Sequence, residues 1–181
     1  MSAVLVAGSF LFGCATPAKV SHMEIKNTAM AFDPSLSGAI AVDQVKGGEG
    51  TNPLWKSKIA NSDFDAAVKS SLKSFSLLSE GKQPAYELSV VIVDVEQPSF
   101  GFDMKVTSKI RYVLVEKSSG KAVFEETIKA PYVAQFSDAF YGASRLKIAT
   151  EESAKKNIAE FLKKLSKLNI DKSKIELVAK S

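Results

Sequence analysis

The single cysteine, Cys14, follows an uncharged apolar run and precedes a polar stretch that contains a proline. A lone thiol can neither close an internal disulfide nor build a zinc site by itself. The apolar run, Ala3–Phe12, has about ten residues, whereas a membrane-spanning helix needs about 20. Its length is instead typical of the apolar part of a secretory signal peptide. The sequence therefore places its one thiol where a signal peptide would end.

The stretch Leu11-Phe12-Gly13-Cys14 resembles the lipobox of bacterial lipoproteins. The resemblance implies that the Cys14 thiol forms a thioether with a diacylglycerol donor and that cleavage leaves Cys14 as the first residue. Two or three acyl chains give a lasting anchor, because each buried methylene contributes about 0.8 kcal/mol. By the same resemblance, Ala15 after the cysteine favours the outer membrane, with the protein facing the periplasm. The alternative is a buried free cysteine in an apolar N-terminal segment.

Other residues that could do chemistry lack the partners they need. His22 is the only histidine and lies in a predicted tether, where no second residue would orient it, so triads and histidine metal sites are not expected. Glu125 and Glu126 are neighbours in a predicted strand and point to opposite faces. Asp94 and Glu96 mark the polar end of another strand. We expect no enzymatic activity, metal or cofactor, with acid–base work by these carboxylates as the alternative.

A glycine-rich stretch, GGEGTNPLW at Gly47–Trp55, invites comparison with phosphate-binding loops. It has neither the GK[ST] ending of a P-loop nor the GxGxxG spacing of a dinucleotide site. We therefore expect a connecting loop, with Trp55 packed over the edge of the core.

Composition indicates one folded domain with short tails. The chain has 181 residues, of which 45% are hydrophobic, and this is enough for a real core. Lysine and arginine number 24 against 20 acidic residues, for a net charge of +4, and the lysines are scattered along the chain. Nucleic-acid binding is not expected from this pattern. We predict a signal peptide at 1–13, a lipidated tether at 14–36, a domain at 37–168 and a tail at 169–181.

Two segments have the apolar periodicity of amphipathic helices. The first is predicted to begin with Ser62 as its N-cap and to end at Gly81. The second extends from Gly142 or Ala143 to Leu165.

Four segments predict strands, at 38–46, 86–96, 102–116 and 122–130. The third alternates cleanly, so that its apolar residues share one face and Lys105, Thr107, Lys109 and Arg111 share the other. The third and fourth form a hairpin around Ser118-Ser119-Gly120, with Phe124 and Ile128 pointing inward.

The order β-α-β-β-β-α predicts an α+β fold, a two-layer sandwich in which two helices cover one face of a four-stranded, mixed or antiparallel sheet. A helix between the first two strands permits them to pair in parallel. This order resembles small outer-membrane lipoproteins, including the lipopolysaccharide-assembly lipoprotein and the auxiliary lipoproteins of ABC-type lipid transport. From about Met23 to Leu165, the stretches GGEGTNPLW, PSFGFDMKVTSKIRY and FSDAFYGASRLKIATEESAKKNI resemble an uncharacterised proteobacterial lipoprotein family.

These observations predict a membrane-anchored, non-enzymatic module that binds an envelope protein of an assembly or transport complex. Aromatic and arginine side chains concentrate binding energy. The expected partner-binding residues are therefore those of the polar strand face and of an aromatic loop: Lys105, Lys109, Arg111, Phe136, Phe140 and Tyr141. One alternative is that the loop aromatics cap the core. Another is a lipid or glycolipid carrier, which would need an apolar cavity of several hundred Å³ or so between helices and sheet.

Overall fold

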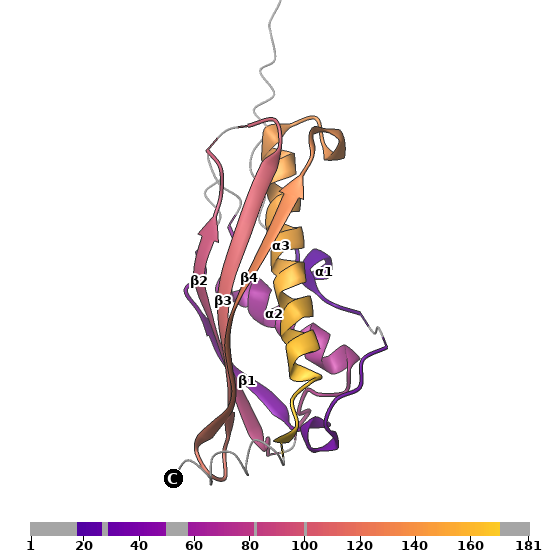
Figure 1. Cartoon of the computed structure of the whole chain (residues 1–181), viewed down its shortest axis with the longest axis vertical. Helices are drawn as coiled ribbons and strands as arrows, with labels where there is room; N and C mark the ends of the chain where they lie inside the picture. The colour runs from indigo at the N-terminus through magenta and orange to yellow at the C-terminus, as the bar shows by residue number, and fades with distance from the viewer. Residues whose placement is uncertain (1–17, 27–28, 50–57, 82, 100, 171–181) are drawn as a thin grey trace, which may run out of the picture.

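The computed structural model describes residues 18–26, 29–49, 58–81, 83–99 and 101–170. A four-stranded sheet forms one layer and helices form the other (Figure 1). The strands lie side by side in chain order: β1 (Ile40–Lys46), β2 (Tyr86–Glu96), β3 (Met104–Glu116) and β4 (Lys121–Ala134). The helices α1 (Val20–Met23), α2 (Asn61–Ser74) and α3 (Gly142–Leu165) all lie on one side of it. The predicted α+β two-layer sandwich is confirmed.

Strand pairing is mixed, as expected. β1 and β2 are parallel and are connected through α2, whereas β2–β3 and β3–β4 are antiparallel. β4 extends to Ala134, beyond the predicted end at Ala130, and includes Pro131 opposite Thr107. Proline is tolerated here because β4 is an edge strand and needs no N–H bond on its outer side.

The apolar core fills the space between the helices and the sheet. Tyr112 of β3 stacks on Phe161 of α3 with a centroid distance of 4.3 Å, and Phe124 of β4 meets Phe161 edge-on. On the β1–β2 side, Phe64 and Leu72 of α2 are fully buried. Phe124 and Ile128 point inward, as predicted.

A buried polar network fixes α3 against the sheet. The backbone N–H of Ser108 donates to Ser153 Oγ at 2.9 Å, and Ser153 Oγ donates to the Ala130 carbonyl at 2.7 Å. The Tyr112 hydroxyl donates to Asn157 Oδ1 at 3.0 Å, and burial raises the pKa of Tyr112 well above its usual value. Because buried polar groups cost free energy unless they are hydrogen-bonded, these contacts specify the position of α3 along the strands.

Both ends of α2 differ from the prediction. The helix begins at Asn61, and its N-cap Ala60 makes no side-chain capping bond, so Ser62 is not the cap. The Asn61 side chain instead accepts a hydrogen bond from the Gly48 N–H at 2.7 Å. The helix ends at Ser74 because the chain reverses at Ser76, which has a positive φ of 57°, well before Gly81.

The segment predicted as a tether is part of the domain from Ala18 onward, which corrects the boundary placed at residue 37. We call the described residues 18–26 and 29–36 the N-terminal strap. Ala18, Met23 and Leu36 are buried in the core. The Ile25 N–H donates to Ser71 Oγ of α2 at 2.9 Å, and Ser74 Oγ donates to the Ile25 carbonyl at 2.8 Å. The strap's apolar residues follow no helix or strand period, so periodicity alone could not reveal its packing.

Docking of the strap should weaken at acid pH. A hydrogen bond from Ser70 Oγ lowers the pKa of Glu24 below 4.5, and bonds from Ser35 and then Ile170 lower the pKa of Asp33 below 3.8. On acidification, both carboxylates therefore take up protons at a higher pH in the unfolded state than in the folded state. The ionised carboxylates stabilise the docked strap at pH values above their usual pKa values. This stabilisation is lost as the pH falls through the lower pKa values of the folded state. We expect amide-exchange protection factors at Ile25 and Leu36 to fall between pH 5 and about pH 3. In Glu24→Gln/Asp33→Asn the pH dependence should flatten; an unchanged pH dependence in that variant would contradict this account.

Candidate functional site

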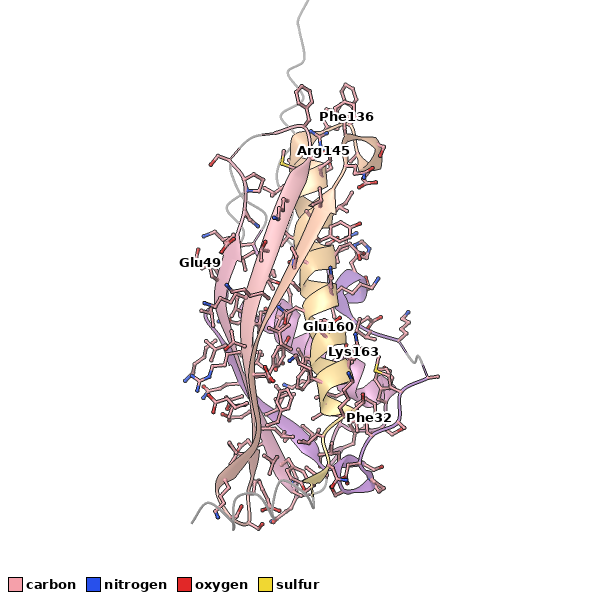
Figure 2. The ribbon with its side chains drawn as sticks, in the orientation of Figure 1. Phe32, Glu49, Phe136, Arg145, Glu160 and Lys163 are labelled. Carbon is pink, nitrogen blue, oxygen red and sulfur yellow. The ribbon has the colours of Figure 1, made fainter. Side chains whose placement is uncertain are left out.

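The described residues bring the predicted site residues together at two places, and Cys14 and Trp55 lie outside those residues. Lys105, Lys109 and Arg111 lie on the sheet face that carries no helix. The predicted aromatic residues lie around η2 (Phe136–Asp138), at the end of the molecule where α3 begins (Figure 2).

The open sheet face carries a group of cations that we call the basic stripe. It consists of Lys105, Lys109 and Arg111 of β3 and Lys129 of β4. Arg111 forms an ion pair with Glu125. Lys109 lies opposite Lys129 in the β3–β4 register and opposite Asp94 in the β2–β3 register. Among the described residues, no carboxylate comes within ion-pair distance of the three lysines.

The exposed aromatic side chains form a second surface, the aromatic tip, made of Phe102, Phe136, Phe140 and Tyr141. Their exposed fractions are 81%, 49%, 78% and 59%. Edge-on contacts connect Phe102 to Phe136, Phe136 to Phe140 and Phe140 to Tyr141, with centroid distances of 6.3, 6.3 and 5.5 Å. Phe102 was expected to begin a strand, but β3 starts at Met104, and this leaves Phe102 outside the ladder.

Arg145, in the first turn of α3, holds the tip together from beneath. Its side chain is 5% exposed, and Nη1 donates to the carbonyls of Ala139 at 2.7 Å and Phe140 at 2.8 Å. The guanidinium also lies 4.9 Å from the ring centroid of Phe136, within cation–π range (Figure 2). No sequence pattern signals this role, because an arginine in a lysine-rich amphipathic helix is ordinarily exposed to solvent.

His22 has an orienting partner, contrary to the expectation from the sequence. Its Nδ1 lies 2.7 Å from Oε2 of the buried Glu151 on α3, and Glu151 Oε1 accepts the Lys19 N–H at 2.7 Å. Lys147 Nζ lies 3.9 Å from the same carboxylate. Both oxygens of Glu151 are thus engaged in attaching the strap to α3, so the pair has a structural role.

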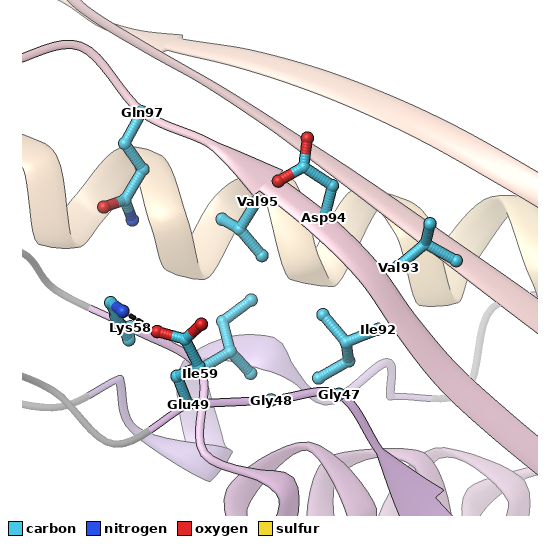
Figure 3. A pocket seen from close by; sticks show the side chains of 10 residues that line it. All are labelled: Gly47, Gly48, Glu49, Lys58, Ile59, Ile92, Val93, Asp94, Val95 and Gln97. Carbon is cyan, nitrogen blue, oxygen red and sulfur yellow. Dashed lines mark ion pairs between the residues drawn. The ribbon is translucent and has the colours of Figure 1, made fainter.

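The described start of the glycine-rich stretch, Gly47–Glu49, borders a hollow of about 250 Å³ (Figure 3). Ten residues line it: Gly47, Gly48, Glu49, Lys58, Ile59, Ile92, Val93, Asp94, Val95 and Gln97. Glu49 and Lys58 form an ion pair at its edge. A Cβ at Gly47, where φ is +83°, would lie 2.1 Å from the Ile92 carbonyl oxygen. Gly47 therefore allows close backbone packing against β2, and a Cβ at Gly48 would lie 2.6 Å from the Ile59 carbonyl oxygen. Close packing accounts for both glycines without a bound phosphate.

The described part of the chain offers neither a metal centre nor a membrane-spanning helix. It contains no group of three or more histidine, cysteine or acidic residues arranged to hold a metal ion. None of its helices has the length and apolar character needed to cross a bilayer.

The sequence matches no protein-family model and no curated protein sequence. Its structure is similar to protein XCC0632 from Xanthomonas campestris, of the DUF330 family, with a TM-score of 0.56 at 11% identity over 81% of this chain and 92% of that one. It is also similar to the hypothetical protein CT253 from Chlamydia trachomatis, with a TM-score of 0.53 at 8% identity over 73% and 97% of the two chains. A minor lipoprotein from Acinetobacter baumannii gives a weaker likeness, with a TM-score of 0.44 at 8% identity over 72% and 94%. At these identities the first two matches establish the fold, and the resemblance to the lipopolysaccharide-assembly lipoprotein stays a prediction.

Proposed function

We propose that this protein is an envelope lipoprotein, attached through Cys14 to the outer membrane and facing the periplasm, that binds an acidic surface of another envelope protein. It would serve as a non-enzymatic accessory of an assembly or transport complex. The observation that carries the proposal is an open sheet face whose central lysines have no carboxylate within ion-pair distance among the described residues.

Charge placement on that face favours an anionic partner. Like charges directly opposite each other in an antiparallel pair are destabilising, and Lys109 faces Lys129 in this way. Asp94 flanks Lys109 on β2 without reaching it. An acidic surface placed over the stripe would relieve this repulsion and would also steer association.

A lipid carrier is the second candidate, and the packing disfavours it. The described space between α3 and the sheet is occupied by fully buried side chains, including Tyr112, Phe161 and Leu162. An acyl chain there would have to displace the stacked rings and the hydrogen bond from Tyr112 to Asn157. The hollow beside Gly47 is lined by the ion pair of Glu49 with Lys58 and by Asp94, which does not suit an apolar ligand.

The test is capture of a partner from detergent-solubilised envelopes with the intact chain as bait. Lys105→Glu/Lys109→Glu reverses two charges of the basic stripe and should capture at least about tenfold less of the same protein, equivalent to about 1.4 kcal/mol or more. Lys155→Glu/Lys163→Glu is the matched control, because it reverses the same number of charges on α3. These two lysines have only surface pairs, of 3.6 Å to Glu152 and 3.8 Å to Glu160, and Figure 2 labels the second pair. Equal capture by the stripe variant and the control would remove the sheet face from the proposal, and co-purified phospholipid without protein would favour the carrier.

A further inference from the structure

We infer that the aromatic tip enters the headgroup region of the membrane that holds Cys14. The end of the domain where α3 begins would then contact the bilayer. The inference rests on the proposed lipid anchor and adds the surface and orientation with which the domain meets lipid.

The composition of the tip suits a lipid interface. Every exposed aromatic side chain among the described residues belongs to it. Aromatic rings concentrate at the level of membrane headgroups, where the apolar body of the ring contacts lipid and its polar edge contacts water. The two carboxylates nearest the tip are engaged with backbone: Asp103 accepts the Phe136 N–H at 3.2 Å, and Asp138 accepts the Gln135 N–H at 2.8 Å.

The tip is also preorganised. The Arg145 guanidinium is buried beneath the rings and bonds two loop carbonyls, so the rings are displayed by a fixed scaffold. Displaying four aromatic rings to water is unfavourable, because apolar surface left exposed forgoes the free energy of burial. A surface of this kind marks contact with a membrane or with a partner.

The length of chain between Cys14 and Ala18 indicates that the membrane is within reach of the tip. The Lys19 N–H donates to Glu151, so Ala18 lies at the level of Glu151, nine positions along α3 from Gly142. At 1.5 Å per residue, the start of α3 is about 14 Å beyond that level. Four residue steps separate Cys14 from Ala18, and they span at most about 14 Å. The anchored sulfur can therefore reach the plane of the tip.

Other surfaces of the domain are less suited to contact the membrane that holds Cys14. Leu165, at the far end of α3, lies 14 positions beyond Glu151, or about 21 Å in the opposite direction, out of reach of the same anchor. The flank beside Ala18 is a shallow hollow whose other lining residues are mostly polar or charged: Lys19, Val20, Ser21, Glu24, Asp63 and Lys147. Of the surfaces within reach, the tip is the apolar one.

A tryptophan placed at the tip tests this orientation. In a Trp55→Phe background, which removes the only tryptophan, Phe140→Trp probes the tip and Ser119→Trp probes the β3–β4 turn at the other end. The full chain is coupled through Cys14, the only cysteine, to maleimide phospholipid in phosphatidylethanolamine–phosphatidylglycerol vesicles whose acyl chains carry bromine near the headgroup. We expect Phe140→Trp to shift to the blue and to lose about half of its emission or more, and Ser119→Trp to keep its emission.

Equal emission and quenching at the two positions would overturn the inference, and this is also the result expected if the tip contacts a protein instead of lipid. Coupling supplies the anchor chemically, so failure of cells to acylate Cys14 would refute the proposed function without deciding this test. Phe102→Trp is a second tip probe, since Phe102 is 81% exposed and contacts only Phe136 among the described rings. Quenching at neither tip position would leave the domain without the proposed membrane contact.

Discussion

Cys14→Ser should move this protein from the membrane fraction to the soluble fraction of disrupted cells. A hydroxyl cannot replace the thiol in the thioether that the lipobox resemblance implies, so the variant would carry no acyl chains. The apolar run before it has about ten residues, about half of what a membrane-spanning helix needs. Two or three chains anchor a protein lastingly and a single chain only marginally, so we expect at least a roughly tenfold drop in the membrane-bound fraction.

The matched control for this prediction leaves the thiol in place. Lys19→Ala lies five residues further along, and its backbone N–H still donates to Glu151, so the variant should stay with the membrane. Unchanged membrane association of Cys14→Ser would remove the anchor from the account. Loss of both proteins from the membrane would point instead to disruption of the strap.

Phe161→Ala should lower the free energy of unfolding by about 3–5 kcal/mol, the usual cost of removing a fully buried phenylalanine. Phe161 has no exposed surface, stacks on Tyr112 at 4.3 Å and meets Phe124 edge-on. Its loss would leave a cavity in the α3–sheet interface, beside the polar network of Asn157 and Tyr112. Denaturant unfolding monitored by circular dichroism measures the difference.

Phe102→Ala is the control for the unfolding measurement on Phe161→Ala. Phe102 is 81% exposed, so its removal should change stability by no more than about 0.5 kcal/mol. The difference between the two variants separates rings that hold the fold from rings that are displayed. If Phe102→Ala were as destabilising as Phe161→Ala, the tip aromatics would be part of the core, and the tip would cease to be a candidate contact surface.

Alternation and period were sufficient to predict most of the fold. β2 matches its predicted bounds, and in β3 the even-numbered positions from Met104 to Leu114 are buried while Lys105 and Arg111 are exposed. These strands obey the period of two because one face meets helices and the other meets solvent. β1 and β2 pair in parallel, as the helix between them permits.

The strap and the role of Arg145 show where local patterns carry no information. Met23 and Leu36 are buried, yet they lie in a segment whose only helices are α1 and the short turn η1 (Pro34–Leu36). Their burial depends on α2 and α3, which come much later in the sequence. The role of Arg145 depends likewise on carbonyls that the loop before α3 presents to it. Both are properties of tertiary contacts, which period and composition do not encode.

The strap gives the proposed anchor a mechanical connection to the domain. Tension at Cys14 would be transmitted through Ala18 and Lys19 to Glu151 on α3, whose far side is bonded to β3 and β4 through Ser153 and Asn157. While the strap stays docked, the open face therefore keeps a fixed orientation relative to Ala18, the first described residue after the proposed anchor. Partner binding by the basic stripe and lipid contact by the tip are compatible, because they use different residues of one domain.

Mass spectrometry of the N-terminal peptide, from protein isolated from bacterial membranes, tests the proposed anchor without intermediate steps. We expect a chain that begins at Cys14, with a diacylglyceryl group on the sulfur and a further acyl chain on the amine. A peptide that still includes residues 1–13 and carries a free Cys14 thiol would contradict the proposed anchor.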